Sequence, residues 1–376
     1  MREPSRHILF LATEFDAPGM RPYAVNIINA LWQPGDHVLI VSRYGADQGF
    51  FPDIPADSFT WIDYPTGKLA KAMFRFRPTA VLNAISDIVA HWGINVIYSL
   101  TEEIILADSI GTLQRQLPVL YTVHDATFHE YKSGSLVRWL KDRLIIARPQ
   151  RLMLERTIHQ VTNSREQLES IIRRFPDHQV HYAPFPTLVN ESIARGGRSV
   201  DELKAADDGY ILFFGTIHFY KGLHLLYDAY LSHSELQSRP LVIAGTRDIY
   251  FQRHSGEKNV IVINRFIDDS EVRDLFGRAA VVVYPYISAT QSGVTSIASY
   301  FGKPMVLSDL PFFKQTCDRC EGVEFFPSGD RQALAKAIGR VLNGKVASTR
   351  PLYDREYAPQ AMSDALNAII NSIACD

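Results

Sequence analysis

Buried-strand patterns that alternate with helical patterns constrain the fold of this chain more than any other feature. In the first half, apolar runs occupy residues 7–15, 37–44, 59–64, 95–100, 118–125 and 159–164. Segments with helical spacing, such as RPYAVNIINAL (21–31), separate most of them. Short apolar runs that alternate with helices are typical of a parallel sheet covered on both faces. The pattern therefore predicts a doubly wound α/β fold.

The second half repeats the alternation. Strand patterns recur at residues 210–216, 240–246, 259–267, 280–286, 304–310 and 323–326. Between the halves, two prolines interrupt HYAPFPTLVN (181–190). Because 376 residues suffice for two domains, we expect Rossmann-like domains over residues 1–186 and 187–354. A ligand is then expected in a cleft between the two sheets, at the carboxyl ends of the strands.

Composition excludes several classes of protein. Lys and Arg number 39 and Asp and Glu 41, so no net charge favours nucleic acid. No apolar run approaches the roughly 20 residues that span a bilayer, and the first residues do not resemble a signal peptide. We therefore expect a cytoplasmic protein. Cys317 and Cys320 form a lone CxxC without a second pair, which favours reduced thiols over a zinc site.

Two nucleotide-binding motifs are absent from the sequence. No GxGxxG follows the first strand, and no GxxxxGK[ST] occurs anywhere in the chain. A dinucleotide oxidoreductase and a P-loop NTPase both become poor candidates.

The stretch FFGTIHFYKGLHLLYDAYL (213–231) is the sharpest local pattern. A buried strand ends at Gly215 and Thr216, and Lys221 precedes an amphipathic helix. A cation at a helix N-terminus opposes the helix dipole, and an anion bound between Lys221 and the helix amides removes that conflict. The alternative is a surface lysine beside an ordinary strand-to-helix turn.

The stretch PYISATQSGVTSIASYFGKP (285–304) is the second pattern, and it contains no acidic residue. Thr290 and Ser292 supply hydroxyls, Gln291 supplies a neutral donor and acceptor, and Gly293 lets backbone amides face a ligand. A phosphate here is held by amides and a dipole. The alternative is a helix capped by Ser292 or Thr290.

A family resemblance rests on several motifs taken together. They are FFGTIHFYKGLHLLYDAYL, PLVIAGT, RFIDDSEVRDLF, VVVYPYISATQSGV, GKPMVLSDL and FFPSGDRQALAKAI, which cover roughly residues 210–342. Their order resembles that of the GT-B-fold, retaining, nucleotide-sugar-dependent enzymes of glycosyltransferase family 4. The first half matches more loosely, through HILFLATEF, VLYTVHDATFH and VTNSREQL.

The resemblance implies a donor nucleotide sugar held by the C-terminal domain and an acceptor lying against the N-terminal domain. It implies that Lys221 binds the diphosphate, that His124 lies near the donor sugar, and that no metal is needed. It places Arg265 and Phe266 beside the nucleoside. It also implies that the final helix, within residues 355–376, packs back on the first domain.

The chain departs from the family pattern at three positions. Thr216 stands where an arginine is usual, and Ala289 and Ile297 stand where two glutamates are usual. One explanation is that Gln291 and Ser292 replace the lost contacts, with positive charge from Arg265. The other is that the donor site has decayed and the protein binds without turnover.

The loop after the first strand, residues 16–22, is expected to be a cleft loop. The resemblance implies a glycine-rich loop here that meets the acceptor and the donor phosphates. This chain offers Gly19, Met20 and Arg21, of which Arg21 is a candidate anion contact. An ordinary helix start is the alternative.

Residues 132–174 are rich in Lys and Arg, with leucines at helical spacing and Trp139 nearby. We expect this segment to meet an anionic membrane surface, which suits a lipid-linked acceptor. A solvated basic face is the alternative.

The sequence thus predicts a glycosyltransferase that moves a sugar from a nucleotide diphosphate sugar to a glycan or lipid-linked glycan, with retention of configuration, in cell-surface polysaccharide synthesis. It is expected to be cytoplasmic, peripheral on the inner face of the membrane. The alternatives are a non-catalytic GT-B-like protein that binds a nucleotide or stabilises a partner, and a nucleotide-sugar epimerase or hydrolase. The last reaction needs carboxylates, for which Glu102 and Glu103 are the candidates.

Overall fold

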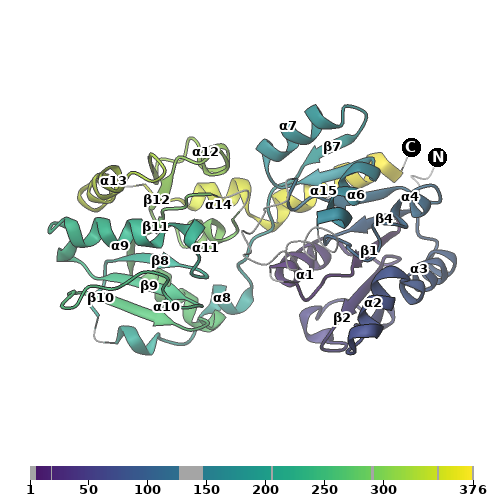
Figure 1. Cartoon of the computed structure of the whole chain (residues 1–376), viewed down its shortest axis with the longest axis horizontal. Coiled ribbons are helices and arrows are strands. Elements are labelled where there is room, and N and C mark those ends of the chain that lie inside the picture. Colours follow the sequence, from purple (N-terminus) through teal and green to yellow (C-terminus); the bar gives the residue numbers. More distant parts are fainter. Residues whose placement is uncertain are drawn as a thin grey trace. The chain divides into compact units, whose positions relative to one another are not determined.

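A computed structural model describes residues 6–17, 19–126, 147–204, 206–288, 292–344 and 347–374 (Figure 1). The chain divides into two units. The first comprises Met1–Pro186 with Pro359–Asp376, and the second comprises Thr187–Ala358. The first division lies in the proline-containing segment between the halves, and the second falls after Ala358 rather than after residue 354.

The first unit contains a seven-stranded sheet of order β3-β2-β1-β4-β5-β6-β7. Its strands pair in parallel throughout. They are β1 (Ile8–Ala12), β2 (His37–Ser42), β3 (Phe59–Asp63), β4 (Val96–Ser99), β5 (Val119–Thr122), β6 (His159–Thr162) and β7 (Gln179–Tyr182).

Helices account for the rest of the regular structure among the described residues of this unit. They are α1 (Met20–Leu31), α2 (Lys68–Phe76), α3 (Thr79–Trp92), α4 (Ile110–Leu113), α6 (Arg148–Arg156), α7 (Arg165–Arg174) and α15 (Pro359–Ala374), with short 3-10 turns η1 (Gln48–Phe50) and η2 (Ala56–Ser58). Alternate residues of β1 enter two different cores, Ile8 and Phe10 on one face and Leu9 and Leu11 on the other. Burial on both faces explains the continuous apolar run.

The C-terminal helix α15 belongs to the core of the first unit. Met362, Leu366 and Ile370 lie in the same core cluster as Ile27 and Ile28 of α1. Their spacing puts them on one face of the helix. The last helix of the chain thus completes the domain that the first strand begins.

The second unit contains a six-stranded parallel sheet of order β10-β9-β8-β11-β12-β13. Its strands are β8 (Tyr210–Phe214), β9 (Leu241–Gly245), β10 (Val260–Asn264), β11 (Ala279–Tyr284), β12 (Met305–Ser308) and β13 (Val323–Phe326). Its helices are α8 (Glu191–Arg195), α9 (Leu223–Ser232), α10 (Asp269–Gly277), α11 (Val294–Tyr300), α12 (Pro311–Cys317), α13 (Arg331–Asn343) and α14 (Arg350–Glu356), with 3-10 turns η4 (Asp201–Leu203), η5 (Phe219–Lys221) and η6 (Leu236–Ser238).

The predicted α/β architecture is confirmed, with one strand missed. β7 (Gln179–Tyr182) lies at the edge of its sheet and is largely half-buried, with an exposed first residue. A short edge strand needs no continuous apolar run, because one side of it meets solvent. The sequence QVHY therefore gave no strand pattern. Among the described residues, no helix is both long and apolar enough to cross a membrane.

Candidate functional site

Two loops of the second unit meet at the point where its strand order reverses. β8 pairs with β9 on one side and with β11 on the other. Ligands of open α/β sheets bind at such a switch point, outside the carboxyl ends of the strands. The loops after β8 and β11 lie there, and the amide of Ile287 donates to the carbonyl of Tyr220 at 2.7 Å. The structure thus brings together the two patterns that the sequence singled out.

Glycine is required where these loops touch. Gly222 has a φ of 64°, and a Cβ at this position would lie 1.9 Å from the carbonyl oxygen of Pro285. Gly215 has a φ of 134°. Side chains are excluded from Gly222 because both its backbone conformation and the neighbouring carbonyl forbid them.

Lys221 is a buried cation between these loops. Lys221 is 8% exposed, and its Nζ atom would lie 3.0 Å from a Cβ placed on Gly215. Burial alone lowers the pKa of Lys221 to about 8, and no carboxylate in the described part of the chain pairs with it. An unpaired buried ammonium is unfavourable, so this arrangement indicates a site for an anion.

Tyr286 forms one wall beside this lysine. The Lys221 Nζ atom lies 5.6 Å from the centre of the Tyr286 ring, a cation–π distance. The Tyr286 hydroxyl is buried, and the Ser292 side chain lies close enough to interact with it. The two hydroxyls therefore lie together beside Lys221. Tyr286 carries no distinguishing pattern in the sequence, where it is one more aromatic residue after a strand.

Arg247 is a second cation that the sequence analysis missed. It follows β9 in the left-handed region, with a φ of 76°, and it is exposed. Burial, then the charges of Arg247 and Lys221, lower the pKa of His218. These three groups therefore lie close enough to interact. Positive φ at a non-glycine residue is uncommon and concentrates at functional sites.

The backbone places Arg247 near Thr216, where the family usually has an arginine. The amide of Ile217 donates to the carbonyl of Thr246 at 2.8 Å, and the Thr216 and Thr246 hydroxyls are 3.5 Å apart. Aromatic contacts brace the same two loops: Phe219 packs edge-on against Tyr250 at 5.6 Å. The loops after β8 and β9 thus lie side by side and carry Lys221 and Arg247.

The helix α11 begins beside Lys221, and its N-cap residue is Gly293. No side chain caps this helix, so Ser292 is not its N-cap; its carbonyl instead accepts from the Thr295 hydroxyl at 3.0 Å. Ile297 is 3% exposed and apolar, so no carboxylate is available there. Ala289 and the predicted site residues Thr290 and Gln291 lie outside the described residues.

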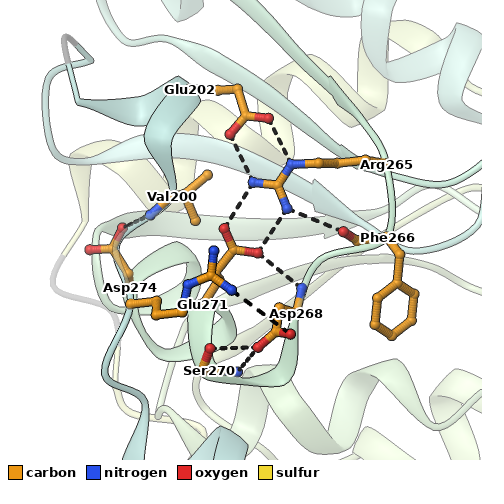
Figure 2. Close-up of polar contacts among 9 residues, drawn as sticks. Val200, Glu202, Arg265, Phe266, Asp268, Ser270, Glu271 and Asp274 are labelled. Atoms are coloured by element: carbon orange, nitrogen blue, oxygen red, sulfur yellow. Dashed lines mark hydrogen bonds and ion pairs between the residues drawn. The ribbon is translucent and has the colours of Figure 1, made fainter.

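Arg265 does not supply free positive charge. Its guanidinium makes paired bonds to Glu202 at 2.8 and 2.8 Å and to Glu271 at 2.7 and 2.9 Å (Figure 2). The Nη1 atom also donates to the carbonyl of Phe266 at 3.1 Å. An arginine has five N–H donors, and all are used here. Arg265 therefore ties η4 to α10, which corrects the expectation that it contributes charge to a bound anion.

The carboxylates of this network are held ionised. The hydrogen bond from Arg265 lowers the pKa of Glu202 to about 2 and that of Glu271 below its ordinary value. Phe266 is 73% exposed, and its ring points away from the polar contacts (Figure 2). The network thus fixes the backbone of Phe266 and leaves its ring on the surface, a flat apolar face on which a base can stack.

His124 of the first unit has a buried imidazole. It follows β5, its Nε2 atom lies 2.9 Å from the carbonyl oxygen of Leu100, and its ring packs edge-on against Tyr23 at 4.7 Å. Burial lowers the pKa of His124 below its ordinary value. The structure thus gives this histidine local structural contacts, and its functional role stays a prediction.

The loop after β1 is ordered by an ion pair. Gly19 has a φ of 84°, and Met20 begins α1. Arg21 donates to Asp16 and lies over the ring of Phe15 at 5.4 Å. The positive charge of Arg21 is therefore already balanced by a carboxylate, and its anion-binding role stays a prediction.

Glu103 lies fully buried at the switch point of the first sheet, between the ends of β1 and β4. It accepts hydrogen bonds from the hydroxyls of Thr13 and Thr101, the second at 2.6 Å. Burial raises the pKa of Glu103 to about 8 and that of Glu102 to about 7. The buried carboxyl group of Glu103 thus links the ends of β1 and β4 through hydrogen bonds.

The basic segment 132–174 is only partly described, because residues 132–146 lie outside the described ranges. Several cations in the described part have partners: Arg148 pairs with Asp108, Arg151 with Glu155, and Arg165 lies over the ring of Tyr182 at 4.0 Å. Cys317 and Cys320 are free thiols, the first of them buried.

Comparison with known proteins gives a family match and a partial relative. Residues 208–344 match the profile of a family described as Glycosyl transferases group 1. An O-antigen chain mannosyltransferase C from Escherichia coli is 28% identical over 153 residues, 38% of this chain. The matched part spans 39% of that protein's length.

Solved structures match over nearly the whole chain. HepE of Anabaena, in complex with UDP and glucose, has a TM-score of 0.67 at 16% identity, covering 98% of this chain and 100% of that one. Sucrose-phosphate synthase from Thermosynechococcus elongatus has a TM-score of 0.61 at 19% identity, covering 99% and 97%. These matches confirm the predicted fold, two Rossmann-like domains as in the GT-B glycosyltransferases.

Proposed function

We propose that this chain is a glycosyltransferase that moves a sugar from a nucleotide diphosphate sugar to a glycan or lipid-linked glycan, with retention of configuration. Lys221 carries the proposal, because it is a buried ammonium at the switch point of the second sheet and no described residue gives it a carboxylate partner. The family match covers this part of the chain. HepE of Anabaena, whose structure is similar to this chain, has been solved in complex with UDP and glucose and with UDP-glucose. This similarity supports a nucleotide sugar as the ligand.

In this proposal, the leaving diphosphate lies against Lys221 and Arg247. The Thr216 hydroxyl, the Tyr286 hydroxyl and the amides of Ser292 and Gly293 add neutral donors. Bond cleavage between the anomeric carbon and the diphosphate places negative charge on phosphate oxygens. Fixed cations and donors around those oxygens stabilise the transition state. The site therefore has a physical means of catalysis that requires no metal ion.

The remaining assignments follow from the resemblance and the fold. As the resemblance implies, the nucleoside lies beside Phe266, Gln291 faces the donor sugar, and His124 lies near that sugar. A role in cell-surface polysaccharide synthesis is supported by the likeness to an O-antigen chain mannosyltransferase. These roles are part of the proposal.

Turnover tests the assignment of Lys221. We expect Lys221→Ala to slow release of the nucleoside diphosphate in the presence of acceptor by about tenfold to a hundredfold, the effect of one lost charge-assisted contact. Lys336→Ala, at an exposed position of α13, is the matched control and is expected to act like wild type. Unchanged turnover in Lys221→Ala would rule out the leaving-group role. Activity is expected to persist in excess EDTA.

Arg247 is tested in the same assay. Arg247→Gln is expected to slow turnover, because it removes a cation from the diphosphate. Arg319→Gln is a close control, since Arg319 is also exposed and has a φ of 61°. Equal activities of the two variants would remove Arg247 from the site.

A non-catalytic binding protein is the second candidate. The buried Ile297 favours it, because a family carboxylate is replaced by a core side chain. Such a protein would bind a nucleotide sugar through Lys221. It would transfer no sugar when it is incubated with an extract of lipids and glycans as acceptors. If transfer occurs, the anomeric configuration of the product, read by NMR, tests retention.

A further inference from the structure

The helix α2 (Lys68–Phe76) presents an unpartnered apolar face. Leu69, Met73 and Phe76 are 75%, 61% and 73% exposed. Their i, i+4, i+7 spacing puts them on one side of the helix. No residue of α2 is buried, and Phe74 is the side chain that packs on the core, edge-on against Tyr64 at 5.5 Å. The helix is thus attached by one side, while its main apolar side faces outward.

Cations occupy other sides of this helix. Lys68 lies next to the apolar face, Lys71 lies on the opposite side, and Arg77 follows the helix. Arg75 is half-buried, and its charge acts on Glu14. The sequence from residue 64 to residue 86 has no acidic residue. In the described part of the chain, neither Lys68 nor Lys71 pairs with a carboxylate. These lysines do not serve the helix itself, because cations in its amino-terminal half oppose the helix dipole. Their charge is available to an external anionic surface.

We propose that α2 is a membrane-contact helix that inserts Leu69, Met73 and Phe76 into the interface of an anionic lipid bilayer. Amphipathic helices of this kind lie in the interface plane, with the apolar side chains among the acyl chains and the cations at the headgroups. Long Lys and Arg side chains reach the headgroups from the flank of the helix. A protein groove would satisfy the apolar side chains but would also need matching carboxylates for the lysines.

A further cation, Arg43, lies beside the tyrosine against which the helix packs. Arg43 stacks over the Tyr64 ring at 5.1 Å, and Tyr64 is the residue that Phe74 packs against. Tyr44, beside Arg43, is 79% exposed. An exposed tyrosine next to an arginine suits the headgroup region, where amphipathic rings gather. The surface proposed for membrane contact therefore extends from α2 to residues 43 and 44.

This surface differs from the basic segment 132–174 that the sequence favoured. Arg148 and Arg151 of that segment are occupied by ion pairs within the chain. The apolar side chains of α2 are instead exposed in a group, on a helix whose two lysines form no ion pair with any described residue. The contact does not depend on the donor site, so it can be measured without any nucleotide.

Vesicle flotation with the full chain tests the proposal. We expect binding to phosphatidylcholine vesicles that contain about 30% phosphatidylglycerol at low salt, and weaker binding to phosphatidylcholine alone. The triple variant Leu69→Ser, Met73→Ser, Phe76→Ser is expected to lose more than about tenfold in partitioning. The double variant Lys68→Glu, Lys71→Glu is expected to lose binding to the anionic vesicles.

The control variant is Ile172→Ser with Arg173→Ala, which changes an exposed apolar residue and a cation on α7. It is expected to bind vesicles like wild type. Loss of binding in this variant alone would move the contact to residues 148–174 and overturn the proposal. So would the absence of flotation for the wild type, or flotation of the triple variant at the wild-type level.

Two further measurements separate other causes. Sedimentation velocity without lipid tests whether α2 joins two copies of the chain. A dimer that the triple variant abolishes would contradict the membrane assignment.

Brominated lipids are expected to quench the fluorescence of Phe76→Trp more strongly than that of the wild type, because the new indole reaches the acyl chains. Equal quenching would show that residue 76 stays in water. Circular dichroism of each variant checks that it is folded.

Discussion

At the scale of single residues, the account depends on a lysine that is buried without a counter-charge. Lys221 has a pKa of about 8, lowered by burial, whereas a bound diphosphate favours its charged form. The lysine is therefore a proton acceptor during binding. The same reasoning applied to Arg265 gives the opposite result, because two glutamates already use its donors.

Binding of a nucleotide diphosphate should take up protons near pH 8. About half of the free protein carries a proton on Lys221 at that pH, so complex formation is expected to take up about half a proton. Calorimetry in two buffers with different ionisation enthalpies measures this number. Lys221→Arg stays charged and should show almost no uptake. The same uptake in both proteins would mean that another group titrates.

Glu103 should make stability depend on pH. Its folded pKa of about 8 lies above its ordinary value of 4.5, so the folded protein holds a proton that the unfolded chain releases. Its contribution is fully present below pH 4.5 and is lost as pH rises to about 8. Glu103→Gln should therefore lose less stability over this pH range, by at least about 1 kcal/mol in the free energy of unfolding. Parallel curves from urea titrations at several pH values would contradict this.

At the scale of elements, the site depends on two loops that touch through glycine. Gly222→Ala should lower the free energy of unfolding by about 3 kcal/mol or more. The new Cβ would collide with the Pro285 carbonyl, and a φ of 64° is unfavourable for alanine. Gly339→Ala in α13 has open space and is expected to be neutral or stabilising. Thermal unfolding compares them. A Gly222→Ala variant as stable as Gly339→Ala would show that the loops do not meet as described.

Elements differ in how far the sequence predicts them. β8, β9 and β11 are buried on both faces, so their continuous apolar runs were enough to predict them. β7 was missed because an edge strand carries no such run. A central strand can be recognised from its own apolar run. An edge strand cannot, because its burial depends on its place in the assembled sheet.

Site residues show the same limit. Lys221 was predicted because it stands at the start of a helix shortly after a buried strand ends, a local pattern. Arg247 was not, because only the pairing of β8 with β9 brings it close to Lys221 and His218. Arg265 was assigned to the anion because Glu202 is far from it in sequence and no local pattern indicates that Glu271 pairs with it.

At the scale of the whole molecule, the first unit is completed by the last helix of the chain. Ile370→Ala should lower the free energy of unfolding of the first unit by about 2–5 kcal/mol, because it leaves a cavity between α15 and the core. Ile172→Ala, at a 45% exposed position, should have little effect. Urea unfolding measures both. Equal stabilities would mean that α15 contributes little to the core.

The two units also divide the proposed tasks. Lys221, Arg247 and Phe266 all belong to the second unit, and α2 belongs to the first. Donor binding and membrane contact can therefore be changed separately by substitution. The triple serine variant of α2 should bind nucleotide like the wild type.

The most direct test of the central claim is calorimetric binding of UDP-, GDP-, TDP- and ADP-sugars to the wild type, Lys221→Ala and Lys336→Ala. The account predicts that a nucleotide sugar binds the wild type, that Lys221→Ala weakens this binding by about 10- to 150-fold, and that Lys336→Ala leaves it unchanged. Binding by Lys221→Ala at the wild-type affinity, or no binding by the wild type to any of the four, would contradict it.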